Sequence, residues 1–227
     1  MEVNTNFGER VVLHTDEMDW IPSPMQGVDR RMLDRIGGEV ARATSIVRYA
    51  PNSSFSAHTH TGGEEFLVLD GVFQDDYGDF PVGSYIRNPP TSRHTPRSDA
   101  GCTIFVKLWQ FDADDRTYIR KNTVDEQFLA SVGEPGVELL PLFRDATEDV
   151  RMERWAPEAS VDRGAPGGLE LLILEGSLTE GAEELPRNTW LRLPKGSDFT
   201  AKAGPEGVLF WIKTGHLTED PKPPKAG

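Results

Sequence analysis

Two histidines and a glutamate lie close together in the first half of the chain. His58 and His60 are two residues apart, so in an extended strand both imidazoles point to the same face. Glu64 is an even number of residues from both histidines, so it points to the same face if residues 61–63 stay extended or form a turn that preserves the alternation. Two imidazoles and a carboxylate on one strand face, followed by the apolar run 66–69, are typical of a metal site inside a β-barrel. The simpler alternative is three polar side chains on a solvated strand end.

A second segment favours the metal site, because together the two segments resemble the paired motifs of the cupin family. The first stretch fits G(X)5HXH(X)3,4E(X)6G from its histidines onward and ends at Gly71. The second fits G(X)5PXG(X)2H(X)3N, with Gly83, Pro89 and His94 in register. By this resemblance, the metal ligands are expected to be His58, His60, Glu64 and His94.

The second motif is matched with two departures, neither at a ligand position. Thr91 stands where the motif has Gly, and Ser98 stands where it has Asn. Within the cupins, the segments RATSIVRYAP, HTHTGGEEFLVLDGVFQDDYG and GSYIRNPP look most like the ChrR type. That type is named for an anti-sigma factor whose C-terminal half is a cupin.

The ligand set limits the cofactor without identifying it. Three neutral imidazoles and one carboxylate leave a divalent ion with one charge neutralised and, in octahedral geometry, two positions open to water or a small-molecule ligand. Such donors suit Zn, Fe, Ni, Cu and Mn, and the order of affinities does not select among them. Zinc would give a closed four-coordinate site or one reactive water, whereas iron(II) could bind dioxygen. We expect one divalent transition metal ion in the first barrel.

The pattern around the motifs predicts an all-β chain. Short apolar segments alternate with turn signals, and no convincing amphipathic helix interrupts them. With the cupin motifs, this pattern predicts a jelly-roll barrel, also called a double-stranded β-helix. The strands expected in the first half cover 43–49, 54–60, 64–70, 83–87, 91–95 and 102–111.

The second half of the chain repeats landmarks of the first. The pattern GxExLxLxG at 63–71 returns at 168–176, 105 residues later, and RYAP at 48–51 returns as RWAP at 154–157, 106 residues later. Motifs that recur in the same order, at a spacing that changes by only a residue or so, indicate a duplicated domain with small deletions. We therefore predict two tandem cupin barrels and a tail. The expected ranges are 1–116 for the metal-binding domain, 117–217 for the degenerate second domain and 218–227 for a flexible tail.

The second copy has lost the ligands. At an offset of 105, the four ligand positions fall on Arg163, Ala165, Leu169 and Phe199. The apolar run 171–174 remains. We expect the second barrel to keep its core and bind no metal, with Leu169 and Phe199 filling the interior.

Charge and cysteine content restrict the partners. The 227 residues include 24 Lys and Arg against 37 Asp and Glu, a net charge of −13. Without a basic stripe, we expect no nucleic-acid partner, and the acidic balance together with the lack of a long apolar run argues against a membrane partner. The single Cys102 excludes an internal disulfide, is interpreted as a buried small hydrophobe and fits a cytoplasmic protein. Because jelly rolls have edges that need covering, we expect a homodimer.

Five other residues receive a local interpretation. Glu65 faces away from Glu64 in a regular strand and is interpreted as a surface or interface charge, with ligation after a bulge as the alternative. His14 and His216 are interpreted as isolated surface histidines. Phe66 and Tyr85 are expected to wall the pocket above the ion.

Three functions remain open. The resemblance implies a metal-binding regulatory or stress-sensing cupin related to anti-sigma factors, although the chain shows no HxxxCxxC zinc domain of that design. The alternative is an iron(II)-dependent dioxygenase acting on a small chelating substrate such as a 1,3-dicarbonyl. A storage or structural β-domain with an incidental metal is the third, because fold alone does not define function.

Overall fold

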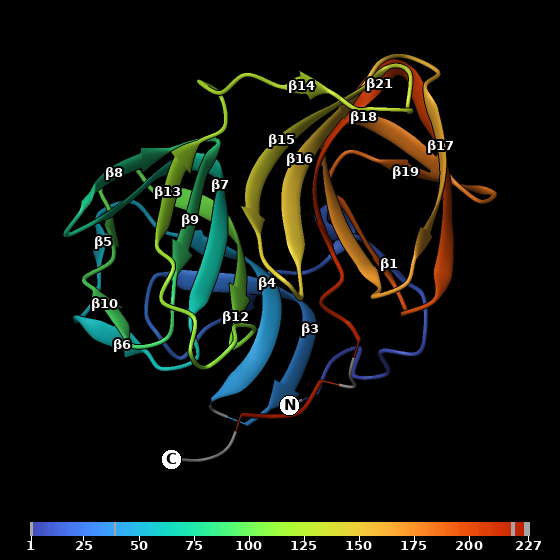
Figure 1. Cartoon of the computed structure of the whole chain (residues 1–227). Helices are drawn as coiled ribbons and strands as arrows, with labels where there is room; N and C mark the ends of the chain where they lie inside the picture. Colours follow the sequence, from blue (N-terminus) through green and yellow to red (C-terminus); the bar gives the residue numbers. More distant parts are fainter. Residues whose placement is uncertain (1, 39, 219–220, 225–227) are drawn as a thin grey trace. The chain divides into compact units, whose positions relative to one another are not determined.

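The computed structural model describes residues 2–38, 40–218 and 221–224. Strands dominate them, and their only helical segment is the 3-10 turn η1 (Thr15–Glu17). No helix in this part of the chain is long and apolar enough to cross a membrane. The strands form two compact units built from antiparallel sheets (Figure 1). The predicted all-β fold with two jelly-roll barrels is confirmed.

The first unit is formed mainly by residues 19–125. Its large sheet runs in the order β13-β9-β7-β12-β4-β3-β2, while β5, β8 and β11 extend it beyond this path and β6 pairs with β10. The strands are β2 (Ile21–Pro22), β3 (Val28–Gly37), β4 (Ala41–Tyr49), β5 (Ser53–Ser54), β6 (His58–His60), β7 (Glu64–Asp75), β8 (Gly78–Pro81), β9 (Ser84–Asn88), β10 (Ser92–His94), β11 (Arg97–Ser98), β12 (Cys102–Leu108) and β13 (Ile119–Asn122).

Strand β7 is longer than predicted because it bends and continues. Its first half pairs with β9 and β12, and its second half pairs with β8 and β11. The bend lies at Gly71, where φ is +69° and a Cβ atom would come within 2.1 Å of the carbonyl oxygen of Gly101. Both the dihedral angle and the close approach require glycine. The bend lets one strand pair with two different sets of neighbouring strands along its length.

The second unit repeats this architecture. Strands β18, β19 and β20 begin and end 105 residues after β7, β8 and β9, which confirms the internal duplication. The sheet order is β1-β20-β18-β21-β16-β15-β14, with β17 and β19 attached to β21 and β18. The strands are β1 (Val11–His14), β14 (Leu129–Ala130), β15 (Val137–Arg144), β16 (Asp149–Trp155), β17 (Ser160–Ala165), β18 (Leu169–Glu180), β19 (Glu183–Pro186), β20 (Thr189–Leu193) and β21 (Ser197–Thr214).

Each unit takes one edge strand from the other half of the sequence. Strand β1 pairs with β20 of the second unit, with Val11 opposite Arg192, and β13 pairs with β9 of the first unit, with Ile119 opposite Arg87. Arg192 follows Arg87 by 105 residues, so the two pairings are equivalent. The duplicated halves have therefore exchanged their first strands.

This exchange makes the compact units differ from the expected linear ranges. The second unit includes residues 6–18, and the first unit extends to Asp125 rather than ending at residue 116. The reason is that β1 and β13 lie beside strands of the opposite half. The expected flexible tail, 218–227, falls partly outside the described residues, which at this end include Thr218 and 221–224.

Each unit has its own apolar core. In the first, the core includes Phe66, Phe73 and Ile86. In the second, Leu169 and Phe199 are almost fully buried among Val, Leu and Ile side chains, as expected for residues that fill the barrel interior.

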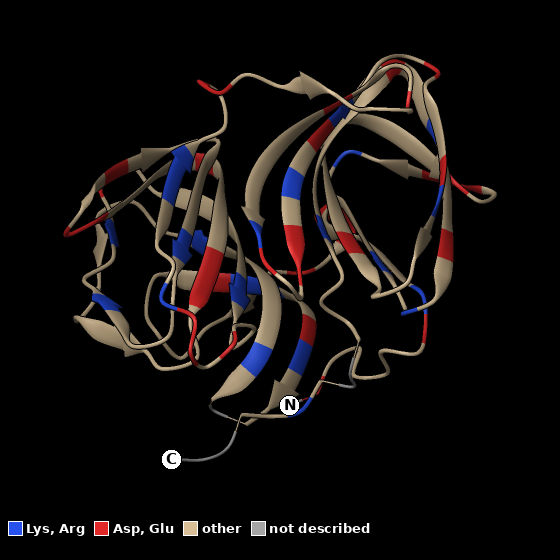
Figure 2. Ribbon diagram, viewed as in Figure 1, with Lys and Arg blue, Asp and Glu red and all other residues tan. Residues whose placement is uncertain are grey.

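A row of charged side chains crosses the large sheet of the first unit, on the face opposite Glu64. Lys107, Glu65 and Arg87 are cross-strand neighbours on β12, β7 and β9, and each is at most 1% exposed. Figure 2 shows the acidic part of β7 between basic parts of the neighbouring strands. Glu65 accepts a hydrogen bond of 2.5 Å from the Tyr85 hydroxyl. The interpretation of Glu65 as a surface charge is therefore wrong, because strand parity predicts the face but not what covers it.

We predict that β13 is required for the first unit to fold. A fragment of residues 1–116 leaves the buried strand β9 without its edge partner and should aggregate, whereas residues 1–125 restore that partner. Soluble yield, size-exclusion profile and thermal unfolding of the two fragments measure the difference. Equal solubility and stability of the two fragments would contradict the prediction.

Candidate metal centre

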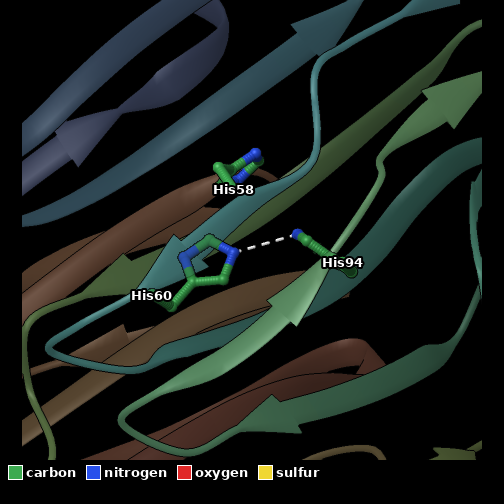
Figure 3. A group of neighbouring side chains, drawn as sticks. All are labelled: His58, His60 and His94. Carbon is green, nitrogen blue, oxygen red and sulfur yellow. Dashed lines mark hydrogen bonds between the residues drawn. The ribbon is translucent and has the colours of Figure 1, made fainter.

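Three histidines converge inside the first unit, from the antiparallel pair β6 and β10. His94 lies opposite His58 in this pair, and Ser92 lies opposite His60. One ring nitrogen from each histidine lies within 4.8 Å of those of the other two. His60 Nε2 and His94 Nε2 are 2.9 Å apart, and Figure 3 shows these rings facing each other with His58 beside them. The two-residue spacing on one strand and the cross-strand register produce this convergence.

Glu64 adds a carboxylate to the cluster. Its Oε2 atom lies 3.3 Å from His60 Nε2 and 3.7 Å from His94 Nε2. The Asn88 amide on β9 donates a 3.2 Å hydrogen bond to the same oxygen and orients it. A tight turn at Gly62 and Gly63 brings Glu64 back to this position. A Cβ atom at Gly62 would lie 2.0 Å from the Trp109 ring, so this turn has no room for a side chain.

The hydrogen bonds that His58 and His94 make outside the cluster indicate which of their ring nitrogens face it. His58 Nδ1 lies 3.1 Å from the carbonyl oxygen of Ser56. A carbonyl only accepts, so Nδ1 carries the proton there and Nε2 keeps its lone pair. His94 Nδ1 lies 3.0 Å from Asp75 Oδ2 in a buried contact. Asp75 has no motif or parity signal in the sequence, because it reaches the cluster only through the bend of β7.

Burial and neighbouring charges act differently on the two inner histidines. Burial lowers the pKa of His60, and this effect exceeds the attraction of Glu64. Burial also opposes the charging of His94, but the hydrogen bond to Asp75 and the charges of Glu64, Asp75 and Asp76 together outweigh it and raise the pKa of His94.

The donor set fits a divalent transition metal ion. Three imidazoles form one group and a carboxylate lies beside two of them, and ions of the zinc, iron and nickel type accept this combination of donors. Within the described ranges, no second cluster of three or more His, Cys, Asp or Glu side chains has ligand atoms this close. The structure thus brings His58, His60 and His94 together in one group and places Glu64 beside two of them.

The second unit holds an ion pair at the corresponding place. Arg163 lies opposite Phe199 in the β17–β21 pair, which is the register of His58 and His94 in the first unit. Arg163 Nη2 lies 2.7 and 2.8 Å from the two carboxylate oxygens of Glu153, which is fully buried. Glu153 also accepts a 2.8 Å bond from Trp155 Nε1. A guanidinium thus stands where the first unit presents imidazoles.

The single-residue interpretations have mixed outcomes. Cys102 is buried as predicted, and burial raises the pKa of its thiol to about 11. Phe66 lies in the core of the first unit, but Tyr85 pairs with Leu67 and bonds Glu65, so its expected place above the ion is wrong. The surface interpretation of His216 is also wrong.

The two isolated histidines each have a partner. The His216 side chain is 7% exposed, and its Nε2 atom lies 3.1 Å from the Glu170 carboxylate. The His14 side chain is partly buried, and its Nδ1 atom lies 3.0 Å from the Thr189 hydroxyl.

Two jelly-roll units with a histidine cluster in one of them define a cupin, and the comparisons agree. Residues 8–112 match the family model of the ChrR Cupin-like domain. The resemblance to the cupin superfamily is thus confirmed, and the family model covers the first half of the chain. No protein of curated function matches it in sequence.

Solved structures resemble the chain across both units. A proposed dioxygenase from Nostoc punctiforme is 15% identical with a TM-score of 0.76, over 97% of this chain and 87% of that one. The pirin YhhW from Escherichia coli, in complex with nickel(II), is 11% identical with a TM-score of 0.64, over 91% and 99%. A mutant form of salicylate 1,2-dioxygenase from Pseudoaminobacter salicylatoxidans is 12% identical with a TM-score of 0.57, over 78% and 70%. At these identities the likeness shows the fold alone.

We predict that Arg163→Ala destabilises the second unit, because it leaves the buried Glu153 carboxylate without one of its closest cations. The free energy of unfolding should fall by about 2–3 kcal/mol, measured by urea denaturation. The matched control is Arg154→Ala, whose side chain is 52% exposed and lies 3.7 Å from Glu138. This control should change stability by less than about 1 kcal/mol. Similar losses from both variants would contradict the prediction.

Proposed function

We propose that the first unit binds one divalent transition metal ion through His58, His60, His94 and Glu64. The observation that carries the proposal is the convergence of three imidazoles in a barrel, with a carboxylate beside two of them. Glu64 and His94 are buried and fixed by Asn88 and Asp75. Ligands held in this way bind a metal with little loss of side-chain entropy.

The centre is accessible on one side and apolar on another. His58 is partly exposed whereas Glu64 and His94 are buried, so the His58 side is the one from which we expect a small molecule to approach. On another side, the Phe73 ring lies 5.9 Å from the His94 ring and packs edge-on against Tyr49. This environment favours a small, flat ligand with oxygen donors and an apolar body.

We propose that the centre acts on such a ligand as a metal-dependent enzyme, with iron(II)-dependent dioxygenase chemistry as the leading class. Four protein donors leave positions for a chelating substrate in octahedral geometry. When bound, iron(II) would supply a binding site for dioxygen and for the oxygen atoms of the substrate. The residues of the chain hold the ion, exclude water along the Phe73 side and leave the His58 side open. Two of the similar structures carry dioxygenase in their description, and these matches include the second unit.

A regulatory function is the second candidate. Residues 8–112 match a family model named for ChrR, and this match is the observation that favours it. In this case zinc would occupy the centre and no substrate would be turned over. The homodimer predicted from the exposed edges of jelly rolls would apply to either candidate, and size-exclusion chromatography with light scattering tests it.

We predict one metal ion per chain in protein purified without chelators, and almost none in the double variant His58→Ala with His60→Ala. Two of the four donors are lost in this variant. Elemental analysis by mass spectrometry measures the content, and His14→Ala serves as a histidine control that retains the ion. Two ions per chain in the wild type would contradict the single-site assignment.

We predict that the iron(II)-loaded protein consumes dioxygen with at least one 1,3-dicarbonyl or catechol-like compound, and that His94→Ala abolishes this consumption. An oxygen electrode with matched iron, nickel, manganese and zinc forms gives the measurement. If a firmly bound metal supports no turnover of any compound, the regulatory candidate replaces the enzyme. If turnover persists in His94→Ala, the ligand assignment is wrong.

A further inference from the structure

Asp75 lies behind His94, on the side of the ring away from the cluster. Its Oδ2 atom is 3.0 Å from His94 Nδ1, and the two side chains are 1% and 2% exposed. The other carboxylate oxygen accepts a 2.7 Å hydrogen bond from the backbone N–H of Tyr77 in the β7–β8 turn. Both oxygens are therefore fixed, and the carboxylate cannot rotate away from the imidazole.

A carboxylate in this position determines the tautomer of the ring. An ionised carboxylate only accepts hydrogen bonds, so Nδ1 of His94 must carry the proton. The lone pair of a neutral ring is then on Nε2, the atom that faces His60 and Glu64. A metal ion needs this lone pair, and the opposite tautomer would present an N–H group to it.

We infer that Asp75 is a positioning residue of the metal centre, which holds His94 in the tautomer and orientation required for ligation. The inference rests on the proposed function, since it assigns a further residue to the same site. Asp75 belongs to neither sequence motif of the ligands, and it acts through His94 rather than by contact with the ion.

The second unit supports a link between this carboxylate and the imidazole. Position 180 corresponds to Asp75 at the offset of 105 and carries Glu180. Phe199 replaces the histidine there, and Glu180 instead accepts hydrogen bonds of 2.7 and 3.0 Å from the Arg10 guanidinium. Where the imidazole is absent, the acid at this position has a cationic partner from a distant part of the sequence.

The test compares Asp75→Asn with Asp76→Asn in the full-length protein. An asparagine amide can donate to Nδ1 and so favour the wrong tautomer of His94. Asp76 accepts the backbone N–H of Thr95 at 2.7 Å, and an asparagine oxygen can still accept this bond. Zinc affinity is measured by competition with a chromophoric chelator, and the coordination is followed in the visible spectrum of the cobalt(II) form.

We expect Asp75→Asn to weaken zinc binding about 10- to 100-fold and to alter the cobalt spectrum, whereas Asp76→Asn leaves both nearly unchanged. Equal affinities and spectra for wild type and Asp75→Asn would overturn the inference. Thermal unfolding of the metal-free proteins shows whether the variant is folded.

A second measurement needs neither a metal nor a stable variant. Long-range proton–nitrogen correlation spectra of the metal-free wild type report which nitrogen of His94 is protonated. The inference expects the proton on Nδ1, and a proton on Nε2 would overturn it. If the wild type binds no zinc or cobalt, the proposed function fails, while these spectra still decide whether Asp75 sets the tautomer.

Discussion

The bend of β7 at Gly71 is the constraint on which the first unit depends. Before the bend, the strand lies in the large sheet and presents Glu64 to the histidine cluster. After it, the same strand pairs with β8 and β11 and brings Asp75 against His94. One strand therefore supplies a carboxylate on each side of the His94 imidazole.

This path is possible only for a residue without a side chain, because the backbone of Gly101 occupies the space that a Cβ atom at Gly71 would need. Gly176 has the same φ of +69° in β18. The bend therefore belongs to the duplicated fold and not to the site alone.

Much of the fold could be predicted from the sequence because its signals are local or repeated. Strand parity placed His58 and His60 on one face, and the spacing of the second motif located His94. The exchange of β1 and β13 could not be predicted, because an edge strand has the same local pattern whichever sheet it joins. Its partner is decided by contacts between residues that are distant in the sequence, as between Val11 and Arg192 for β1 and between Ile119 and Arg87 for β13. The errors at the site have the same origin. Parity correctly placed Glu65 on the face opposite Glu64, but only the folded chain shows that this face is covered. Asp75 lies after the bend, where counting alternate residues from Glu64 no longer predicts the face. The alternation of side chains along a strand thus predicts the face of each residue up to the first bend or bulge, and not beyond it.

The two units show two ways to satisfy the same electrostatic requirement. A carboxylate inside a barrel is costly unless a cation or several hydrogen-bond donors accompany it. In the second unit, Glu153 is fully buried and the requirement is met within the chain by Arg163, Arg151 and the Trp155 indole. In the first unit, the neutral Asn88 amide and the histidine rings surround Glu64, and burial keeps the pKa of His60 low. A divalent ion under the proposed function would supply the charge that the arginines supply in the second unit. The two carboxylates are not counterparts, because Leu169 stands at the position of Glu64, so the second unit lost the ligand carboxylate together with the imidazoles and uses the Arg163 guanidinium for Glu153.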